Sequence, residues 1–189
     1  MNVVEQLLGR GGDDQRLALI DAALADDAAA ARRSAAAGRA THAGVAAVSY
    51  AQLATLVDET AQRLRQAGVV PGADGVARIG IAAPNGIPHV VLALAVLRAG
   101  GCVVPVAGEL APRERQALLC ALHPRAVLVA DGARWDEARD GTTITTLDVA
   151  GSTVRVVAAP GGEAGARSPY DEADLARLDP AFIRFSLAK

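Results

Sequence analysis

Apolar side chains recur at helical spacing in three segments of the chain. Residues 50–66 have apolar side chains on one helical face, and Ser49 can cap the start of this helix. Residues 87–99 are almost wholly apolar, which is typical of a buried helix. Residues 112–122 have the pattern of a third helix. We therefore expect three helices in the middle of the chain.

Short apolar or β-branched runs separate these helices and predict strands. They cover residues 45–50, 76–83, 102–106, 126–130, 142–147, 154–158 and 181–186. Strand, helix and strand alternate through the middle of the chain, which is typical of a parallel sheet covered on both faces. The predicted fold class is therefore α/β, with a layered, largely parallel sheet and helices on both faces.

The two ends of the chain differ in composition from its middle. Residues 15–39 are rich in alanine, and Leu17, Ile20 and Leu24 have helical spacing, so we expect a helix there. Residues 160–169 are rich in glycine and poor in apolar side chains, as a linker is. The predicted organisation is an N-terminal extension (1–14), an α/β subdomain (15–158), a flexible linker (159–170) and a C-terminal helix and strand (171–189).

Composition and charge narrow the classes of function. The 189 residues are 51% hydrophobic with a net charge of -2, which fits one globular domain or one large subdomain. The basic residues are scattered, so we expect no nucleic-acid partner. The most apolar run, residues 90–97, is far shorter than the roughly 20 residues that cross a bilayer. The first ten residues lack the pattern of a secretion signal. We expect a cytoplasmic protein without a membrane span.

Asn85 is one candidate for a site residue in the middle of the chain. It follows a predicted strand and precedes the buried helix, a position at which open α/β sheets bind ligands. Two interpretations are open, a site residue or a cap of the following helix, and the cap is preferred. His42, His89 and His123 form no metal-binding pattern, and we expect each of them on the surface or at a helix end.

Other reactive or aromatic residues suggest packing rather than chemistry. Cys102 and Cys120 lack the spacing of metal ligands and are expected to be small buried apolar residues. Trp135 and Tyr170 are interpreted as packing residues. Adjacent acidic residues point about 100° apart on a helix, so we interpret the acidic pairs as solvated charge. We therefore predict no catalytic residue and no metal site from these residue types.

Several short stretches carry a family resemblance. They are Val48-Ser49-Tyr50-Ala51-Gln52-Leu53, Leu64-Arg65-Gln66-Ala67-Gly68-Val69, Ile79-Gly80-Ile81, Leu97-Arg98-Ala99-Gly100-Gly101-Cys102-Val103-Val104-Pro105-Val106 and Asp179-Pro180-Ala181-Phe182-Ile183. In this order and spacing the chain resembles the adenylate-forming, or AMP-binding, superfamily. It is most similar to the N-terminal subdomain of an acyl-CoA or aryl-CoA synthetase-like ligase, over residues 15–189.

The resemblance implies an activity and its partners. Such a ligase activates a carboxylic acid with ATP, releases pyrophosphate, and transfers the acyl group to a thiol such as that of CoA or a carrier protein. Mg2+ accompanies the ATP. The partners implied are the carboxylic acid, the thiol, and either the remaining subdomains of the enzyme or a second copy of the chain.

The resemblance also implies a site at the end of the sequence. Ser186 and Lys189 resemble the first hydroxyl and the closing lysine of the loop that binds the ATP phosphates, but only Leu187 and Ala188 lie between them, where the family has a Ser/Thr/Gly-rich stretch. Three explanations are open: the loop is left out of the sequence, it has been deleted, or the natural protein lacks it. We expect this chain alone to be inactive and to bind neither ATP nor Mg2+ tightly. The alternative function is a non-catalytic α/β binding or assembly module derived from the same scaffold.

Overall fold

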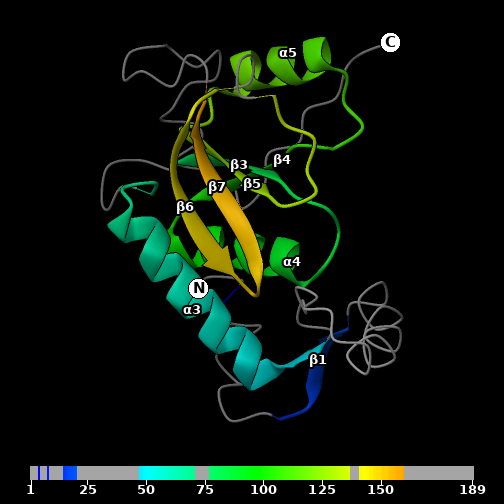
Figure 1. Cartoon of the computed structure of the whole chain (residues 1–189). Helices are drawn as coiled ribbons and strands as arrows, with labels where there is room; N and C mark the ends of the chain where they lie inside the picture. The colour runs from blue at the N-terminus through cyan, green and yellow to red at the C-terminus, as the bar shows by residue number, and fades with distance from the viewer. Residues whose placement is uncertain are drawn as a thin grey trace, which may run out of the picture.

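The computed structural model describes Val4, Leu8 and residues 15–20, 47–70, 77–136 and 141–159 (Figure 1). Within this part the predicted α/β fold is confirmed, and all three predicted helices form. The helices are α3 (Tyr50–Gln66), α4 (Ile87–Ala99) and α5 (Pro112–Leu122). The strands are β1 (Leu17–Ile20), β2 (Ala47–Ser49), β3 (Arg78–Ala82), β4 (Cys102–Pro105), β5 (Ala126–Ala130), β6 (Thr143–Val149) and β7 (Ser152–Ala158).

The main sheet has five strands in the order β4-β3-β5-β7-β6. Strand β3 pairs in parallel with both β4 and β5, as the alternation of strands and helices predicts. Strands β6 and β7 add an antiparallel hairpin beside β5, so the sheet is mixed. The hairpin turns at Ala150 and Gly151, whose φ angles of 51° and 78° match the tight turn that joins antiparallel strands.

Helices cover both faces of this sheet and divide the core into two clusters. Helices α3 and α4 lie together over one face and form the larger cluster (Figure 1). Helix α5 covers the other face with Leu118, Leu119 and Leu122, which pack against Val127 and Val129 of β5. Strand β5 is buried along its whole length because it supplies side chains to both clusters.

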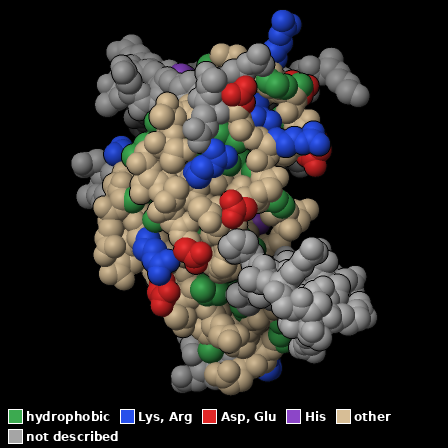
Figure 2. Space-filling model, viewed as in Figure 1, with side chains coloured by type: hydrophobic (Ala, Val, Ile, Leu, Met, Phe, Trp, Pro, Cys, Tyr) green, Lys and Arg blue, Asp and Glu red, His purple; other side chains and the backbone are tan. Residues whose placement is uncertain are grey.

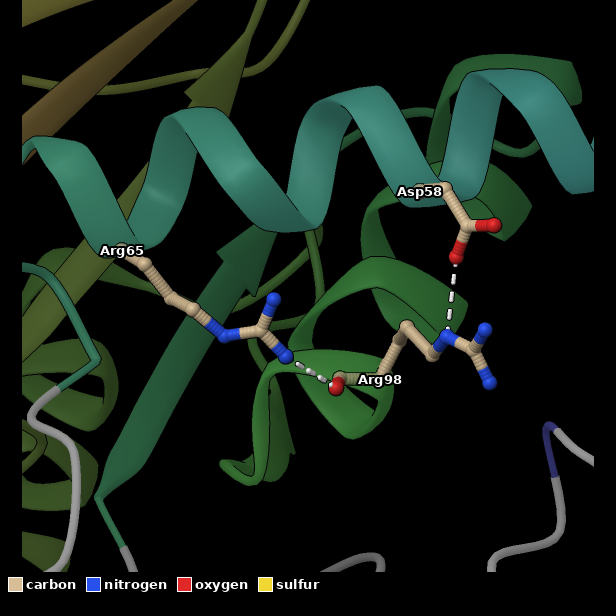
Figure 3. Close-up of polar contacts among 3 residues, drawn as sticks. All are labelled: Asp58, Arg65 and Arg98. Carbon is tan, nitrogen blue, oxygen red and sulfur yellow. Dashed lines mark hydrogen bonds and ion pairs between the residues drawn. The ribbon is translucent and has the colours of Figure 1, made fainter.

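Helix α3 begins at a reciprocal cap and is tied to α4 at the surface. The Ser49 hydroxyl accepts a hydrogen bond from the Gln52 amide at 3.2 Å, and the Gln52 side chain accepts one from the Ser49 amide at 2.9 Å. Figure 3 shows the link to α4, in which Arg98 Nε donates to Asp58 Oδ1 at 2.8 Å. Arg65 Nη2 also donates to the Arg98 carbonyl, at 2.6 Å.

The prediction of a helix over residues 15–39 is wrong at its start. Residues 17–20 form β1, which pairs antiparallel with β2, and the Tyr50 amide donates to the Arg16 carbonyl at 3.0 Å. Pairing with a strand distant in sequence overrides the local helical preference at these positions. The rest of that predicted helix lies outside the described residues. So do residues 160–170 of the predicted linker and the C-terminal helix and strand, and the predicted domain boundaries stay predictions.

Charged side chains of both signs are interspersed on the face of the molecule shown in Figure 2. Among the described residues, no helix is long and apolar enough to cross a membrane. Of the residues in the predicted N-terminal extension, Val4 and Leu8 are buried and belong to the larger core cluster. This extension therefore contributes apolar side chains to the folded core.

Candidate functional site

A cavity of about 730 Å³ opens where the three parallel strands end. Its walls come from three connections, each of which follows one strand: Ala82–Asn85 after β3, Pro105–Glu109 after β4, and Gly132–Arg134 after β5. His89 of α4 and Arg115 of α5 complete the lining. Open α/β sheets bind their ligands outside the carboxyl ends of the strands, so this cavity is the candidate site of the described part of the chain.

Asn85 lines this cavity and does not cap α4. The N-cap residue of α4 is Gly86, and no side chain makes a cap hydrogen bond there. The preferred interpretation of Asn85 as a helix cap is therefore wrong. The cap position is one residue later, and Pro88 lies in the first turn, where its missing N–H group costs no helical hydrogen bond. Asn85 is left exposed beside the cavity with an amide that can donate and accept hydrogen bonds.

His89 lies in the first turn of α4, at the cavity, and is partly buried. Its Nδ1 atom is 3.3 Å from the Ala83 carbonyl oxygen. Because a carbonyl oxygen only accepts hydrogen bonds, Nδ1 is the donor in this contact. His123 ends α5 in a left-handed conformation. Both positions confirm the prediction of helix-end histidines, and His42 lies outside the described residues.

The connection after β5 is held in place on two sides. Asp131 Oδ2 accepts a hydrogen bond from the Thr153 amide at 2.9 Å, and the Asp131 amide donates to the Thr153 carbonyl at 3.1 Å. Gly132 has a φ angle of 80°, and a Cβ atom placed on it would lie 3.3 Å from Pro84 Cγ. The walls after β3 and β5 are therefore in close contact at this point.

Two arginines give the cavity positive charge. Arg115 is only 5% exposed, and its guanidinium lies over the Trp135 ring with 5.6 Å between Cζ and the ring centroid. Arg134 is exposed, as is Glu109 in the connection after β4. Trp135 packs against the smaller core cluster, which agrees with its interpretation as a packing residue. Guanidinium groups beside a polar cavity are suited to bind carboxylate or phosphate oxygens.

Arg115 and Arg134 line the cavity although the sequence pattern did not predict them as site residues. Arg134 lies four residues after a predicted strand. Residues that follow parallel strands often line ligand sites, so this position was the signal that could have identified Arg134. In the sequence, Arg115 is one polar residue within a predicted helix. Its burial depends on contacts with residues distant in sequence, such as Trp135. Ser186 and Lys189, the predicted remnant of the phosphate loop, lie outside the described residues.

The two cysteines have different environments. Cys102 is buried, as predicted, whereas Cys120 is exposed on α5, so the prediction of burial is wrong for Cys120. The smaller core cluster is filled by neighbouring leucines of the same helix, which turns Cys120 outward.

Among the described residues, no group of three or more His, Cys, Asp or Glu side chains could hold a metal ion.

Comparison with known proteins found a family model, a sequence relative and similar solved structures. The sequence model of the AMP-binding enzyme family matches residues 26–186. The AMB antimetabolite synthetase AmbB of Pseudomonas aeruginosa is 36% identical over 132 residues, which are 67% of this chain and 10% of AmbB. The crystal structure of IdnL1 is 25% identical with a TM-score of 0.53, over 74% of this chain and 26% of IdnL1. That of apo MatB from Rhodopseudomonas palustris is 22% identical with a TM-score of 0.49, over 67% of this chain and 21% of MatB.

The chain spans about a tenth of AmbB and about a quarter of IdnL1. The family match covers most of the chain and includes the strands and helices that surround the cavity. The predicted resemblance to an N-terminal subdomain of adenylate-forming enzymes is thereby confirmed. This chain belongs to the AMP-binding enzyme family.

Proposed function

We propose that this chain is the N-terminal part of an ATP-dependent carboxylate-activating ligase. In this reaction a carboxylate oxygen attacks the α-phosphorus of ATP, the bond to the pyrophosphate oxygen breaks, and an acyl-adenylate forms. A thiol then attacks the acyl carbonyl carbon and AMP leaves. The acceptor is the thiol of CoA or of a carrier protein. The family match over residues 26–186 is the observation that carries this proposal.

Ser186 and Lys189 are proposed as the flanks of the loop that binds the ATP phosphates. Catalysis of phosphoryl and adenylyl transfer depends mainly on positioning the phosphates and neutralising their charge. Leu187 and Ala188 supply no side-chain donor between these flanks. Mg2+ would accompany the ATP phosphates. Since the described residues offer no group suited to a metal ion, we assign no protein ligand to it.

The cavity at the strand ends is proposed to receive a phosphate-bearing substrate of this reaction. Arg134 is the exposed cation at its rim, and a phosphate group of ATP or of CoA is the matching anion. Calorimetric titrations of the purified chain with CoA and with ATP show which of the two substrates supplies the phosphate group that binds in the cavity. Arg134→Ala is expected to weaken the binding of whichever substrate enters the cavity, whereas Arg113→Ala, an exposed arginine of α5 that does not line it, leaves binding unchanged. Equal affinities of the Arg134→Ala variant and the unchanged chain, or no binding of either substrate to the unchanged chain, would exclude this role.

The activity proposal is tested by the release of pyrophosphate. The purified 189-residue chain, supplied with ATP, Mg2+ and a panel of carboxylic acids, is expected to release none above background. The reason is that Ser186 and Lys189 do not enclose a phosphate-binding loop. Carboxylate-dependent release of pyrophosphate by this chain would contradict the assignment of these two residues as remnants.

We also propose a cytoplasmic location, in which ATP and CoA are available.

A non-catalytic binding or assembly module is the second candidate. The direct junction of Ser186 and Leu187 is the observation that favours it, since a module on this scaffold needs no phosphate loop. Such a module would associate with the remaining subdomains of an enzyme or with a second copy of itself. Sedimentation of the purified chain as a monomer at all concentrations would count against self-association.

A further inference from the structure

Arg115 connects two walls of the cavity. We use the name β4–α5 loop for residues 106–111 and the name β5 loop for residues 131–136. Arg115 Nη2 donates to the carbonyl of Leu110, in the β4–α5 loop, at 3.3 Å. The same guanidinium lies 5.6 Å from the ring centroid of Trp135, in the β5 loop. One side chain therefore contacts both loops.

The surroundings of Arg115 hold its guanidinium in place against Leu110 and Trp135. The residue is 5% exposed, and Leu110 and Trp135 both pack against the smaller core cluster. Because a guanidinium is planar, it can stack on an indole ring with its face while its edge donates hydrogen bonds. A lysine ammonium has the same charge but no such plane. The geometry at this position is therefore specific for arginine.

The two loops that Arg115 contacts follow different strands of the sheet. The β4–α5 loop connects an edge strand to α5, whereas the β5 loop follows the central strand of the sheet. Val106, Ala107, Gly108 and Glu109 of the first loop and Gly132, Ala133 and Arg134 of the second line the cavity. A change in the separation of these loops changes the width of the cavity.

We propose that Arg115 is a positioning residue, which fixes the β4–α5 loop against the β5 loop and so sets the width of the cavity. The proposal rests on the proposed function in one respect, namely that this cavity receives a substrate. It assigns to Arg115 no contact with the reacting atoms.

Trp135 provides a direct readout because it is the only tryptophan in the 189 residues. The fluorescence of the purified chain therefore reports on the β5 loop, without any ligand. In Arg115→Ala and Arg115→Lys variants we expect stronger quenching of this fluorescence by acrylamide and a shift of the emission maximum to longer wavelength. Arg113→Ala, which removes an exposed arginine of the same helix, is the matched control and should leave both quantities unchanged.

A general loss of stability is separated from loss of positioning by a second control and a second measurement. Leu64→Ala removes a fully buried side chain of α3, in the larger core cluster and not in the cluster that Trp135 contacts, and should lower the unfolding midpoint without raising the quenching of the native protein. Hydrogen exchange should become faster in both loops of the Arg115→Lys variant and stay unchanged in α3, which packs in the larger core cluster. If Arg115→Ala fails to fold, Arg115→Lys decides the question.

Folded Arg115→Lys with unchanged quenching and unchanged exchange in both loops would overturn the proposal. Faster exchange in the β5 loop alone would also overturn it, because the two loops would then not be coupled through Arg115. Neither result bears on the ligase assignment, since no substrate is present in these measurements. Conversely, failure of the ligase assignment would leave the measured coupling of the loops intact.

Discussion

Gly80 of β3 lies directly beside Val127 of β5, and the two residues are partners in the parallel register. A Cβ atom on Gly80 would lie 2.9 Å from Val127 Cγ2 and 3.1 Å from Val127 Cγ1. Since the valine is branched at Cβ and fully buried, it cannot turn away from an added methyl group. The close approach at the centre of the sheet therefore requires glycine at position 80.

Gly80→Ala is expected to destabilise the domain by about 1–3 kcal/mol, the usual range for overpacking a core. Urea denaturation gives the free energy of unfolding. In the Gly80→Ala/Val127→Ala double variant the loss should be smaller than the sum of the two single losses, because the second change makes room for the first. Additive losses would mean that the two residues are not in steric conflict.

Ser49→Ala removes the side-chain acceptor that caps α3. We expect a loss of about 0.5–2 kcal/mol in the free energy of unfolding, as for other N-cap serines. Thr55→Ala is the control on the same helix, since Thr55 is exposed and its hydroxyl donates only to the Ala51 carbonyl. Alanine is the better helix former at that position, so this variant should be unchanged or slightly more stable. Equal effects of the two changes would contradict the role of Ser49 as a cap.

The ion pair between Asp58 and Arg98 is expected to contribute little to stability. Its side chains are 56% and 35% exposed, and pairs of this kind are worth about 0.2–1 kcal/mol. Asp58→Asn should therefore have a small effect that shrinks further in high salt. Leu64→Ala, at a fully buried position of the same helix, should cost about 2–5 kcal/mol. A larger loss for Asp58→Asn than for Leu64→Ala would show that charge rather than packing holds α3 to α4.

The three central helices could be predicted from the sequence because their signals are local. Capping by Ser49, the continuous apolar run of α4 and the prolines and glycines near the helix ends all lie within a few residues of the boundaries they specify. The hairpin strands were likewise visible as β-branched runs. The sequence therefore specifies the central α/β layers strongly.

Strand β1 and the cavity could not be predicted in the same way. Leu17 and Ile20 fit a helical spacing, and only the pairing with β2 makes them part of a strand. Arg115 is one more polar residue in the sequence of α5, and its role depends on Leu110 and on Trp135 in the loop that follows the next strand. Both features depend on contacts that local patterns do not encode.

A longer loop between Ser186 and Leu187 is expected to restore binding of ATP phosphates. Insertion of a Ser/Thr/Gly-rich segment adds backbone and hydroxyl donors that converge on an anion. Calorimetry should then show tighter binding of ATP with Mg2+ than for the unchanged chain, and Lys189→Ala in the same variant should weaken it. An insertion of equal length made of alanine and leucine is the control. Equal affinities with both insertions would count against Ser186 and Lys189 as flanks of a phosphate site.

The proposal of a ligase subdomain is tested most directly by a chimera with AmbB. Residues 47–159 of this chain would replace the matching segment of AmbB, and the exchange of pyrophosphate into ATP would be measured with and without a panel of carboxylic acids. A subdomain of a carboxylate-activating ligase should support carboxylate-dependent exchange, at a reduced rate. A folded chimera without such exchange, beside an unaltered AmbB that performs it, would contradict the account.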